Sequence, residues 1–533
     1  MIRISNIKVK PNEDKNDILA KGCKKIRVGA ESVKEWNIVK ESLDARNKNN
    51  IFFIYTIDVK VNNEEKILKS AKSIDVSKGT VIDYVLPNEN INKGVRPVIV
   101  GFGPAGMFAA LSLCQMGFSP IVLERGNDVD ERVKDVEVFW QTGKLSVSSN
   151  VQFGEGGAGT FSDGKLTYRS KNPRCGKVFL EFVKAGAPKD ILYSYNPHIG
   201  TDKLREVVKN IREEIKSLGG EIRFGAQLTD VIVENGAIKA VVINNEEEMM
   251  CSDVLLAIGH SARDTFEMLN DRKVALEQKA FAVGVRIEHL QENINKAQYG
   301  EHFEEERLKT AEYKLVYTTK KGRGVYTFCM CPGGQVVAAA SENEALAVNG
   351  MSYHARAEKN ANSAVLVQIE PKDFETSNPL AGMFFQRELE KKAYIMGGSN
   401  YFAPCQKVGD FLCDKESTEF GEVLSSYTPG VKFCDLNQLF PEFMVESLKE
   451  AIVEMGKRLK GFDCEDGILT AVESRSSSPI RITRDLATGE SVGIKGLYPL
   501  GEGAGYAGGI VSAAVDGIMV AEKILEKYKV KKK

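Results

Sequence analysis

Several features that mark particular protein classes are missing from this 533-residue sequence. No C-x-x-C pair occurs among its ten cysteines, and Met1–Asn6 lacks the apolar core of a signal peptide, so we expect free thiols in a reducing cytoplasm. No apolar stretch reaches the roughly eighteen residues of a membrane helix, since Gly508–Val520 is interrupted by Asp516. The formal net charge of −1 provides no overall attraction for nucleic acids or anionic membranes.

Histidine is also scarce, with five residues in the chain. The H-E-x-x-H motif, the P-loop and the spacings of zinc ligands are absent from the sequence, so no metal site is expected. Cys329 and Cys331 lie two residues apart, which on a strand would place both side chains on one face. Simple packing and a redox or metal role are both open for this pair.

A glycine fingerprint is the most informative feature that is present. Arg96–Gly106 reads as a buried strand that enters a G-x-G-x-x-G turn. Gly101 would make the tight turn, Gly103 would let the backbone approach a pyrophosphate, and Gly106 would allow a helix to pack closely on the strand. This pattern predicts a dinucleotide-binding site.

The residues that follow complete the expected βαβ unit. Met107–Met116 is apolar, lacks proline and precedes Gly117, so it predicts the helix whose N-terminal amides hold phosphates. Pro120–Leu123 predicts the second parallel strand, and Glu124 at its end would accept hydrogen bonds from ribose hydroxyls. A strand, a helix, a second strand and an acid in this order favour a cofactor site over a purely structural turn.

A second glycine-rich junction between a strand and a helix lies near the other end of the chain, at Gly501–Ile510. Gly508 and Gly509 would let the backbone come close to a cofactor. The helix that starts there would direct its N-terminal amides and positive dipole at the part of a flavin where negative charge gathers on reduction. Together the two motifs indicate one large cofactor, FAD, held from both ends of the chain.

The loop Gly154–Leu166 has five glycines in its first eleven residues. Such a backbone can wrap a phosphate and present amides to a flavin ring. Lys165 is the only cation in the loop, and a place near the flavin or pyrophosphate and a place on the surface are both open. Asp163 is interpreted as a turn residue rather than an acid catalyst.

The order of these motifs resembles the two-part FAD fold of the glutathione-reductase-like flavoproteins. Three stretches, Gly154–Leu166, Glu473–Arg481 and Leu497–Gly509, more closely resemble a bacterial group of FAD-dependent dehydrogenases of unknown substrate. The resemblance covers the chain from about residue 96 to its end, and it is specific for FAD binding but not for a reaction. It implies that Glu502 lies beside the ribityl and pyrophosphate portions of FAD.

The expected fold class is α/β. A small N-terminal α+β domain is predicted at 1–95, with strands at 2–9 and 52–60 and a helix at 16–26. A Rossmann-like FAD-binding domain is predicted in two parts, at 96–271 and 480–533. Its first part would include a hairpin that turns through Glu234-Asn235-Gly236 and a strand at Ser252–Gly259. Between the two parts, an inserted mixed-sheet α+β substrate domain at 272–479 would carry five strands and a helix, at 280–287, 314–319, 325–330, 336–340, 364–369 and 379–396.

Candidate site residues follow from these motifs. His260 comes directly after a strand that ends at Gly259, so proton transfer and a hydrogen-bonded cap are its two possible roles. Arg475 is followed by three serines, which suits an anionic or carbonyl substrate oxygen, although a plain polar loop remains open. The predicted catalytic residues are His260, Arg475 and Ser476, and the predicted cofactor-binding residues are Gly101, Gly103, Pro104, Ala105, Gly106, Glu124, Arg125, Gly157, Gly159, Thr160, Lys165, Leu228, Gly259, Gly501, Glu502, Gly508, Gly509 and Ile510.

The predicted function is hydride transfer between a small organic substrate and flavin N5. The absence of C-x-x-C argues against a flavoenzyme with a dithiol relay. Because only one complete fingerprint is visible, NADH or NADPH, if used, would visit the same cleft transiently. Two alternatives stay open: an RNA-modifying flavoprotein, against which the near-neutral charge weighs, and a non-catalytic redox sensor that carries flavin.

Overall fold

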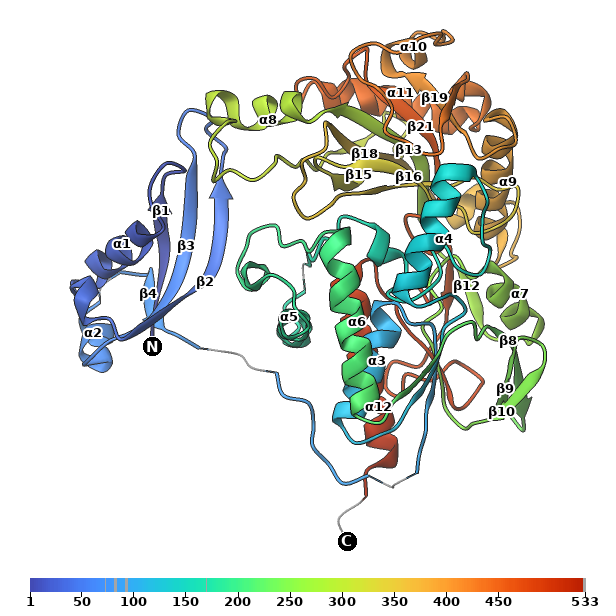
Figure 1. The fold of residues 1–533 in the computed structure, drawn as a ribbon, viewed down its shortest axis with the longest axis horizontal. Helices are drawn as coiled ribbons and strands as arrows, with labels where there is room; N and C mark the ends of the chain where they lie inside the picture. Colours follow the sequence, from blue (N-terminus) through green and yellow to red (C-terminus); the bar gives the residue numbers. More distant parts are fainter. Residues whose placement is uncertain (72, 81–83, 92–93, 169, 531–533) are drawn as a thin grey trace.

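The computed structural model describes residues 1–71, 73–80, 84–91, 94–168 and 170–530. Its N-terminal part is a four-stranded antiparallel sheet in the order β2-β3-β1-β4, accompanied by two helices (Figure 1). The backbone amide of Glu41 donates to the carbonyl of Tyr193 at 2.7 Å, and Arg307 donates to the Tyr55 hydroxyl at 3.0 Å, so this sheet contacts the rest of the chain. The elements are β1 (Ile2–Val9), α1 (Asn16–Ile26), β2 (Glu35–Asp44), β3 (Phe52–Lys60), α2 (Glu64–Ser70) and β4 (Val76–Lys78).

A five-stranded parallel sheet in the order β23-β11-β5-β6-β7 lies in the middle of the chain's fold. Its strands are short, and all but the edge strand β7 are buried, as in parallel sheets covered on both faces. They are β5 (Val98–Val100), β6 (Ile121–Leu123), β7 (Glu221–Arg223), β11 (Val254–Leu256) and β23 (Leu497–Pro499). Because β23 comes from the C-terminal segment, both ends of the region after residue 95 build one sheet.

Helices cover one face of this sheet and a small β-layer covers the other. α3 (Pro104–Gln115) packs against α12 (Ile510–Tyr528), and a side chain at Gly517 would overlap the carbonyl of Ala105, so glycine permits this close crossing. Figure 1 shows α6 running beside α3, and the two helices are in contact. The remaining elements of this part are α4 (Val129–Thr142), α5 (Arg174–Lys184), α6 (Thr201–Ser217), β8 (Leu228–Glu234), β9 (Ala237–Ile243), β10 (Glu247–Met250) and α7 (Arg263–Asp271).

The region after α7 forms a seven-stranded sheet in the order β14-β15-β18-β13-β21-β19-β20. The β19–β20 pair is parallel and the others are antiparallel, so the sheet is mixed, with helices α8, α9, α10 and α11 around it (Figure 1). Its strands are β13 (Phe281–Leu290), β14 (Val316–Thr318), β15 (Gly324–Cys331), β18 (Asn360–Ile369), β19 (Ala403–Lys407), β20 (Val431–Phe433) and β21 (Ile468–Glu473). The helices are α8 (Gln291–Tyr299), α9 (Ala381–Met396), α10 (Val408–Leu412) and α11 (Glu442–Gly456). Two small antiparallel ladders lie outside this sheet: β16 (Gln335–Ala338) pairs with β17 (Val348–Met351), and β12 (Leu276–Gln278) pairs with β22 (Ile480–Ile482).

Several predicted bounds differ from the structure for local reasons. The predicted strand Ser252–Gly259 is paired only at Val254–Leu256, because the chain turns away at Gly259, whose φ is +68°. The predicted helix at 107–116 starts earlier, at Pro104, since proline is favourable in the first turn of a helix. The hairpin turn through Asn235 and Gly236 was predicted correctly, and both residues have the positive φ that a tight hairpin requires.

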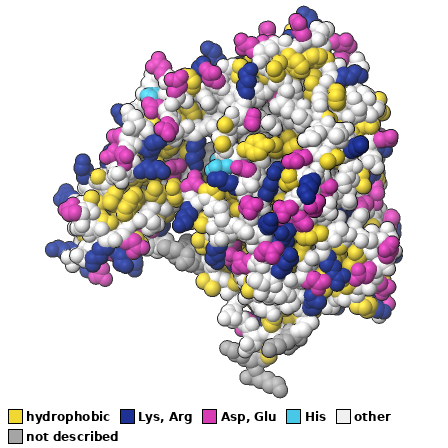
Figure 2. Space-filling model, in the orientation of Figure 1, with side chains coloured by type: hydrophobic (Ala, Val, Ile, Leu, Met, Phe, Trp, Pro, Cys, Tyr) yellow, Lys and Arg dark blue, Asp and Glu magenta, His cyan; other side chains and the backbone are white. Residues whose placement is uncertain are grey.

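The described surface carries charges of both signs. Figure 2 shows Lys and Arg side chains interspersed with Asp and Glu over the face that it draws. Among the helices that the structure describes, none combines the length and apolar character needed to cross a membrane.

Candidate cofactor and active site

A cavity of about 260 Å³ opens at the carboxyl ends of the parallel strands. Ligands of open α/β sheets bind at this edge. The cavity is lined from three directions: by the loops after β5, β6, β11 and β23, by the glycine loop after residue 153, and by the edge of the seven-stranded sheet. Thus both glycine motifs and the third part of the chain contribute to one site.

The three fingerprint glycines have different surroundings. Gly101 has a φ of +96°, and a Cβ there would overlap the carbonyl of Ala257. Gly103 faces the cavity, and the nearest atom to an added Cβ would be the Gly157 Cα at 3.7 Å. Gly106 does not line the cavity; a Cβ there would overlap the Gly101 carbonyl, so this glycine permits helix-to-strand packing. Pro104 and Ala105 line the cavity at the start of α3.

Glu124 at the end of β6 lines the cavity and is almost completely buried. Its Oε2 accepts the Phe102 amide at 2.8 Å, and its Oε1 accepts the amides of Gly126 at 2.9 Å and Gly154 at 3.0 Å. These bonds hold the fingerprint loop and the glycine loop together beneath the cavity. The predicted contact with a ribose would use the remaining acceptor capacity of this carboxylate.

Two further predicted residues lie at the same end of the cavity. Arg125 lines it and donates to Asp264 at 3.0 and 3.1 Å, and its guanidinium lies 4.3 Å from the ring centroid of Phe153. Leu228, the first residue of β8, also lines the cavity. The Arg125 guanidinium therefore already contacts the Asp264 carboxylate and the Phe153 ring.

The late glycine motif reaches the cavity through most of its residues. Glu502, Gly508, Gly509 and Ile510 line it, and no described atom lies within 4 Å of a Cβ added at Gly508 or Gly509. Gly501 lies behind the lining; its amide donates to Asp516 at 2.7 Å and it packs against Ala105. The N-terminal turn of α12 therefore points at open space, as an anion-binding helix end requires.

The glycine loop contributes Gly157 and Gly159 to the lining, but two predicted residues of this loop do not reach it. Thr160 is fully buried, and its hydroxyl donates to the Glu155 carbonyl at 3.3 Å. Lys165 requires a correction as well: it is not among the lining residues, and its Nζ donates to Asp163 at 2.6 Å and to the Met330 carbonyl. The Lys165 ammonium is therefore paired with a carboxylate outside the lining.

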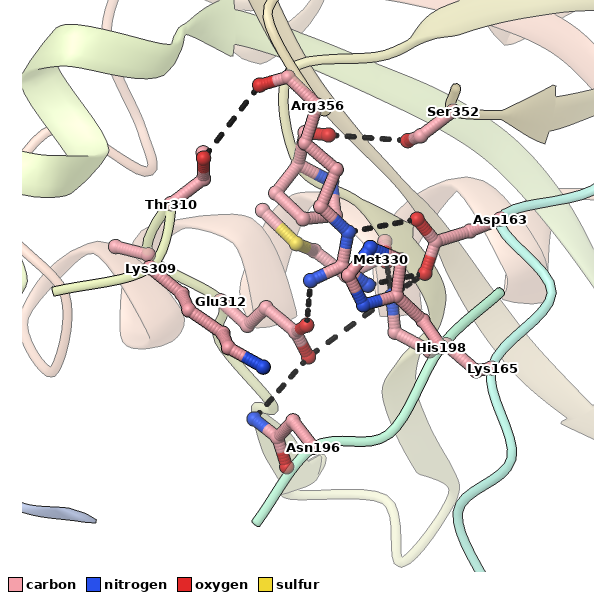
Figure 3. A network of polar contacts seen from close by, with 12 residues as sticks. Asp163, Lys165, Asn196, His198, Lys309, Thr310, Glu312, Met330, Ser352 and Arg356 are labelled. Atoms are coloured by element: carbon pink, nitrogen blue, oxygen red, sulfur yellow. Dashed lines mark hydrogen bonds and ion pairs between the residues drawn. The ribbon is translucent and has the colours of Figure 1, made fainter. Parts of the chain in front are cut away.

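Figure 3 shows the network that Lys165 enters. Asp163 is fully buried and also accepts from Arg356 Nε at 2.9 Å and Nη2 at 2.5 Å, while Arg356 Nη1 donates to Glu312 at 2.6 Å. Burial alone would raise the pKa of Asp163, but Lys165 and Arg356 hold it well below its usual range. Asp163 is therefore the centre of a buried ion cluster, and not the turn residue that the sequence suggested.

The predicted catalytic residues all line the cavity, but they differ in how many of their polar atoms are already hydrogen-bonded. His260 Nδ1 lies 2.5 Å from Glu502 Oε2, and its Nε2 is buried and has no hydrogen-bond partner among the described residues. Arg475 is engaged by other side chains: it donates to Glu390 at 3.0 and 2.9 Å and to the Ser341 hydroxyl, and its predicted contact with a substrate oxygen stays a prediction. Ser476 donates to the Ala282 carbonyl at 2.9 Å.

Some lining residues were not predicted for the site. Phe328, Cys329, Asn349 and Glu473 come from or near strands of the third region, and the residue pattern of a buried sheet does not reveal which strand end meets a cavity. The Cys329–Cys331 spacing was the one available signal. The two side chains do not share a face as predicted, because the strand pairing shifts between Phe328 and Cys331 and Cys329 has a φ of +44°.

Metal ligation has no support in the described residues. No three His, Cys, Asp or Glu side chains gather there as a metal ion would require.

The sequence is similar to a known relative over nearly its whole length and to two family models over parts of it. The sequence is 51% identical to an uncharacterised protein of Clostridium beijerinckii over 533 residues, which covers 99% of each chain. The chain belongs to the family of this clostridial protein. Residues 280–476 match a family model described as FAD-dependent protein, C-terminal domain-like, and residues 1–60 match a domain of unknown function.

Solved structures are only distantly similar. Halogenase PltM is 10% identical, with 82% of this chain and 70% of that chain covered and a TM-score of 0.38. L-proline dehydrogenase from P. horikoshii is 12% identical, with coverages of 84% and 96% and a TM-score of 0.35. Glycine oxidase from Bacillus cereus is 12% identical, with coverages of 81% and 97% and a TM-score of 0.34. Scores this low do not establish a common fold.

Proposed function

We propose that this chain is an FAD-dependent oxidoreductase that transfers hydride between a small organic substrate and flavin N5. The observation that carries the proposal is the composition of the cavity. Gly103 from the first glycine motif, Gly509 from the second and Cys329 from the seven-stranded sheet line the same space. A site with a nucleotide cradle on one side and a separate sheet on the other suits a cofactor that meets a substrate at its ring.

The residues around the cavity fit the chemistry of FAD. Open space faces Gly103, Gly508 and Gly509, where backbone must approach a pyrophosphate or a ring. α12 begins at Ile510, so its N-terminal amides and dipole would stabilise negative charge in the cavity. When bound, the flavin would supply reversible two-electron chemistry, and the chain would hold and polarise the reactants.

His260 and Glu502 provide a polar pair beside this cradle. Because a carboxylate only accepts hydrogen bonds, the His260 Nδ1 carries the proton that lies between the two groups. In that tautomer a ring without a second proton would present Nε2 as an acceptor to a hydroxyl in the cavity. We propose that this pair binds a ligand hydroxyl, and that it also provides the candidate proton-transfer group predicted from the sequence.

The substrate end is proposed to be the part lined by Phe328, Cys329, Asn349 and Ser476. The second electron carrier is proposed to be either another small molecule or NADH or NADPH, visiting the same cavity in turn. The family model that matches residues 280–476 is described as FAD-dependent, which supports a flavin-related role for this region.

Anaerobic reduction of the flavin-loaded protein tests the proposal. NADH, NADPH and a panel of amino acids, hydroxy acids and amines would be added separately while the flavin absorbance is followed. We expect bleaching by at least one compound, and reoxidation by a second. A protein that keeps its flavin but turns over with no compound of the panel would support a redox sensor instead.

A further inference from the structure

A second cavity, of about 250 Å³, lies where the N-terminal sheet meets the rest of the chain. It shares no lining residue with the cofactor cavity. Most of its lining side chains carry a hydroxyl, an amide or a charge. They are Leu43, Ala45, Tyr195, Asn196, Gln298, Tyr299, Lys309, Thr310, Glu312 and Arg356. A space of this size and polarity suits a small polar molecule rather than an apolar one.

The end of β2 forms one wall of this second cavity. Leu43 lies near the end of the strand and Ala45 follows it, and both line the space. The Glu41 amide of the same strand donates to the Tyr193 carbonyl at 2.7 Å, which fixes the strand against this part of the chain. The other lining residues come from the segment around Asn196, from the end of α8 and from the loops beyond it. The N-terminal part and the region around the seven-stranded sheet therefore border this space together.

Lys309 and Glu312 bring opposite charges to the lining, and these charges do not pair with each other. Lys309 Nζ donates to the Ser194 hydroxyl at 2.8 Å and lies 3.4 Å from Asp190. Glu312 Oε1 accepts from Arg356 at 2.6 Å. Among the described residues no ion pair joins Lys309 to Glu312, although Figure 3 shows both side chains reaching toward the same space.

Several polar groups of this lining can take a further hydrogen bond. Glu312 Oε2 has two long contacts, at 3.5 Å from Asn196 Nδ2 and at 3.9 Å from Lys165 Nζ. The Thr310 hydroxyl also has a long contact, 3.5 Å from a backbone carbonyl. The Lys309 ammonium has three N–H donors, of which the Ser194 hydroxyl accepts one at short distance. A ligand that offers both an acceptor and a donor would complete these partners.

The charges of the lining and of its ion-pair partners balance. They are the cations Lys165, Lys309 and Arg356 and the carboxylates Asp163, Asp190 and Glu312. Taking a net charge into a partly buried site costs free energy unless an opposite charge compensates it. A ligand that carries one charge of each sign keeps the balance, and its two ends match Lys309 and Glu312.

We propose that the second cavity is a binding site for a small zwitterion, an α-amino acid. Its carboxylate accepts from Lys309 Nζ and the Thr310 hydroxyl, and its ammonium donates to Glu312 Oε2. The proposal does not depend on the oxidoreductase function, because the two cavities share no lining residue. It also gives the N-terminal sheet a role, since the end of β2 forms a wall of the ligand site.

Titration of the full-length protein with glycine, L-alanine, L-serine and L-glutamine tests the proposal. By isothermal titration calorimetry we expect at least one of them to bind with a dissociation constant of about 1 mM or lower. Propionate, which keeps only the carboxylate, and ethylamine, which keeps only the ammonium, should each bind at least about tenfold more weakly. Absence of binding by all four amino acids, or propionate binding as tightly as the best of them, would overturn the proposal.

Variants show whether the amino acid binds in this cavity. Lys309→Met removes the ammonium and should weaken binding by at least about tenfold. Ala45→Phe adds a ring to the wall formed by the N-terminal part and should weaken binding as much without changing a charge. Lys314→Met, at an exposed lysine outside the lining, is the matched control and should bind like the wild type. Melting temperatures of the ligand-free variants confirm that they fold.

The same variants distinguish the two cavities. Amino-acid binding that survives both Lys309→Met and Ala45→Phe would place the ligand elsewhere, for example in the cofactor cavity, and would overturn the proposal. Loss of binding in both variants with an unchanged FAD content would support it, because neither residue lines the cofactor cavity. A protein that binds these amino acids but no FAD would overturn the proposed function and leave the second site standing.

Discussion

The Nδ1 atom of His260 lies 2.5 Å from the Oε2 atom of Glu502, although 242 residues separate the two in the sequence. β11 and β23, which pair in parallel, end just before these residues and bring them to the same edge of the sheet. Glu502 Oε1 also accepts the amide of Ser478 at 3.0 Å. This carboxylate therefore orients a histidine and a backbone loop at the same time, beside the cavity.

Glu502→Gln tests the value of this arrangement for the cofactor. The amide keeps the shape but removes the charge that orients His260, so we expect FAD affinity to fall by about 10- to 100-fold, equivalent to about 1.5–3 kcal/mol. Isothermal titration of the flavin-free protein with FAD measures the change. Glu526→Gln, which alters an exposed carboxylate of α12, is the matched control; equal affinities in both variants would count against a role for Glu502.

Two fingerprint glycines should respond differently to alanine. At Gly103 the nearest atom to a new Cβ is 3.7 Å away, so Gly103→Ala should fold normally and lower FAD affinity by about tenfold or more. At Gly106 the new Cβ overlaps a carbonyl, so Gly106→Ala should lower the melting temperature. Gly176→Ala, in α5 with no described atom near its new Cβ, is the control for both readouts. Full FAD affinity in Gly103→Ala would show that this loop does not hold the cofactor.

The ion cluster of Figure 3 should be important for stability. Asp163→Asn leaves the buried Arg356 and the adjacent Lys165 without their shared carboxylate, and we expect a loss of about 3–5 kcal/mol in the free energy of unfolding. Denaturant unfolding measures it. Asp190→Asn, at a carboxylate whose side chain is 41% exposed and lies 3.4 Å from Lys309, should cost no more than about 1 kcal/mol. Similar losses in the two variants would contradict the special position of Asp163.

Acid should destabilise the protein through a buried histidine. Burial lowers the pKa of His289 to about 4, below the value of about 6.5 expected in the unfolded chain. The unfolded state therefore binds more protons between pH 6.5 and 4, and the contribution of neutral His289 is lost as pH falls through this range. At pH 5 this contribution has decreased by about 2 kcal/mol.

The variant His289→Gln should show a smaller loss of unfolding free energy between pH 7 and pH 5 than the wild type. The comparison is made by urea unfolding at both pH values, with His302→Gln as the control at an exposed histidine. A pH dependence that His289→Gln leaves unchanged would show that another group is responsible.

The sequence predicted most of the secondary structure near the cofactor site, because local patterns determine it. The G-x-G-x-x-G turn, the hairpin at Asn235–Gly236 and the apolar helix after Gly103 each follow from steric and hydrophobic rules that act within a few residues. The helix Asn16–Ile26 and the strand Phe52–Lys60 have the predicted bounds for the same reason.

The sequence was less informative wherever a side chain's partner is distant. Nothing near Lys165 indicates that Glu312 and the Met330 carbonyl will lie beside it, and nothing near Arg475 indicates Glu390. Cys329 is a further case, since the register shift against β18 that turns it toward the cavity depends on a strand thirty residues further along the chain. Charge pairing and strand register are decided by the folded structure, and they set which polar groups remain free to react.

The central claim is that both glycine motifs hold one FAD. The most direct measurement is the flavin content of the purified full-length protein, determined by releasing the chromophore with acid, identifying it by chromatography and comparing it with protein concentration. We expect FAD at about one equivalent per chain after incubation with excess cofactor, and much less in Gly103→Ala. A colourless protein that retains no added FAD would contradict the claim.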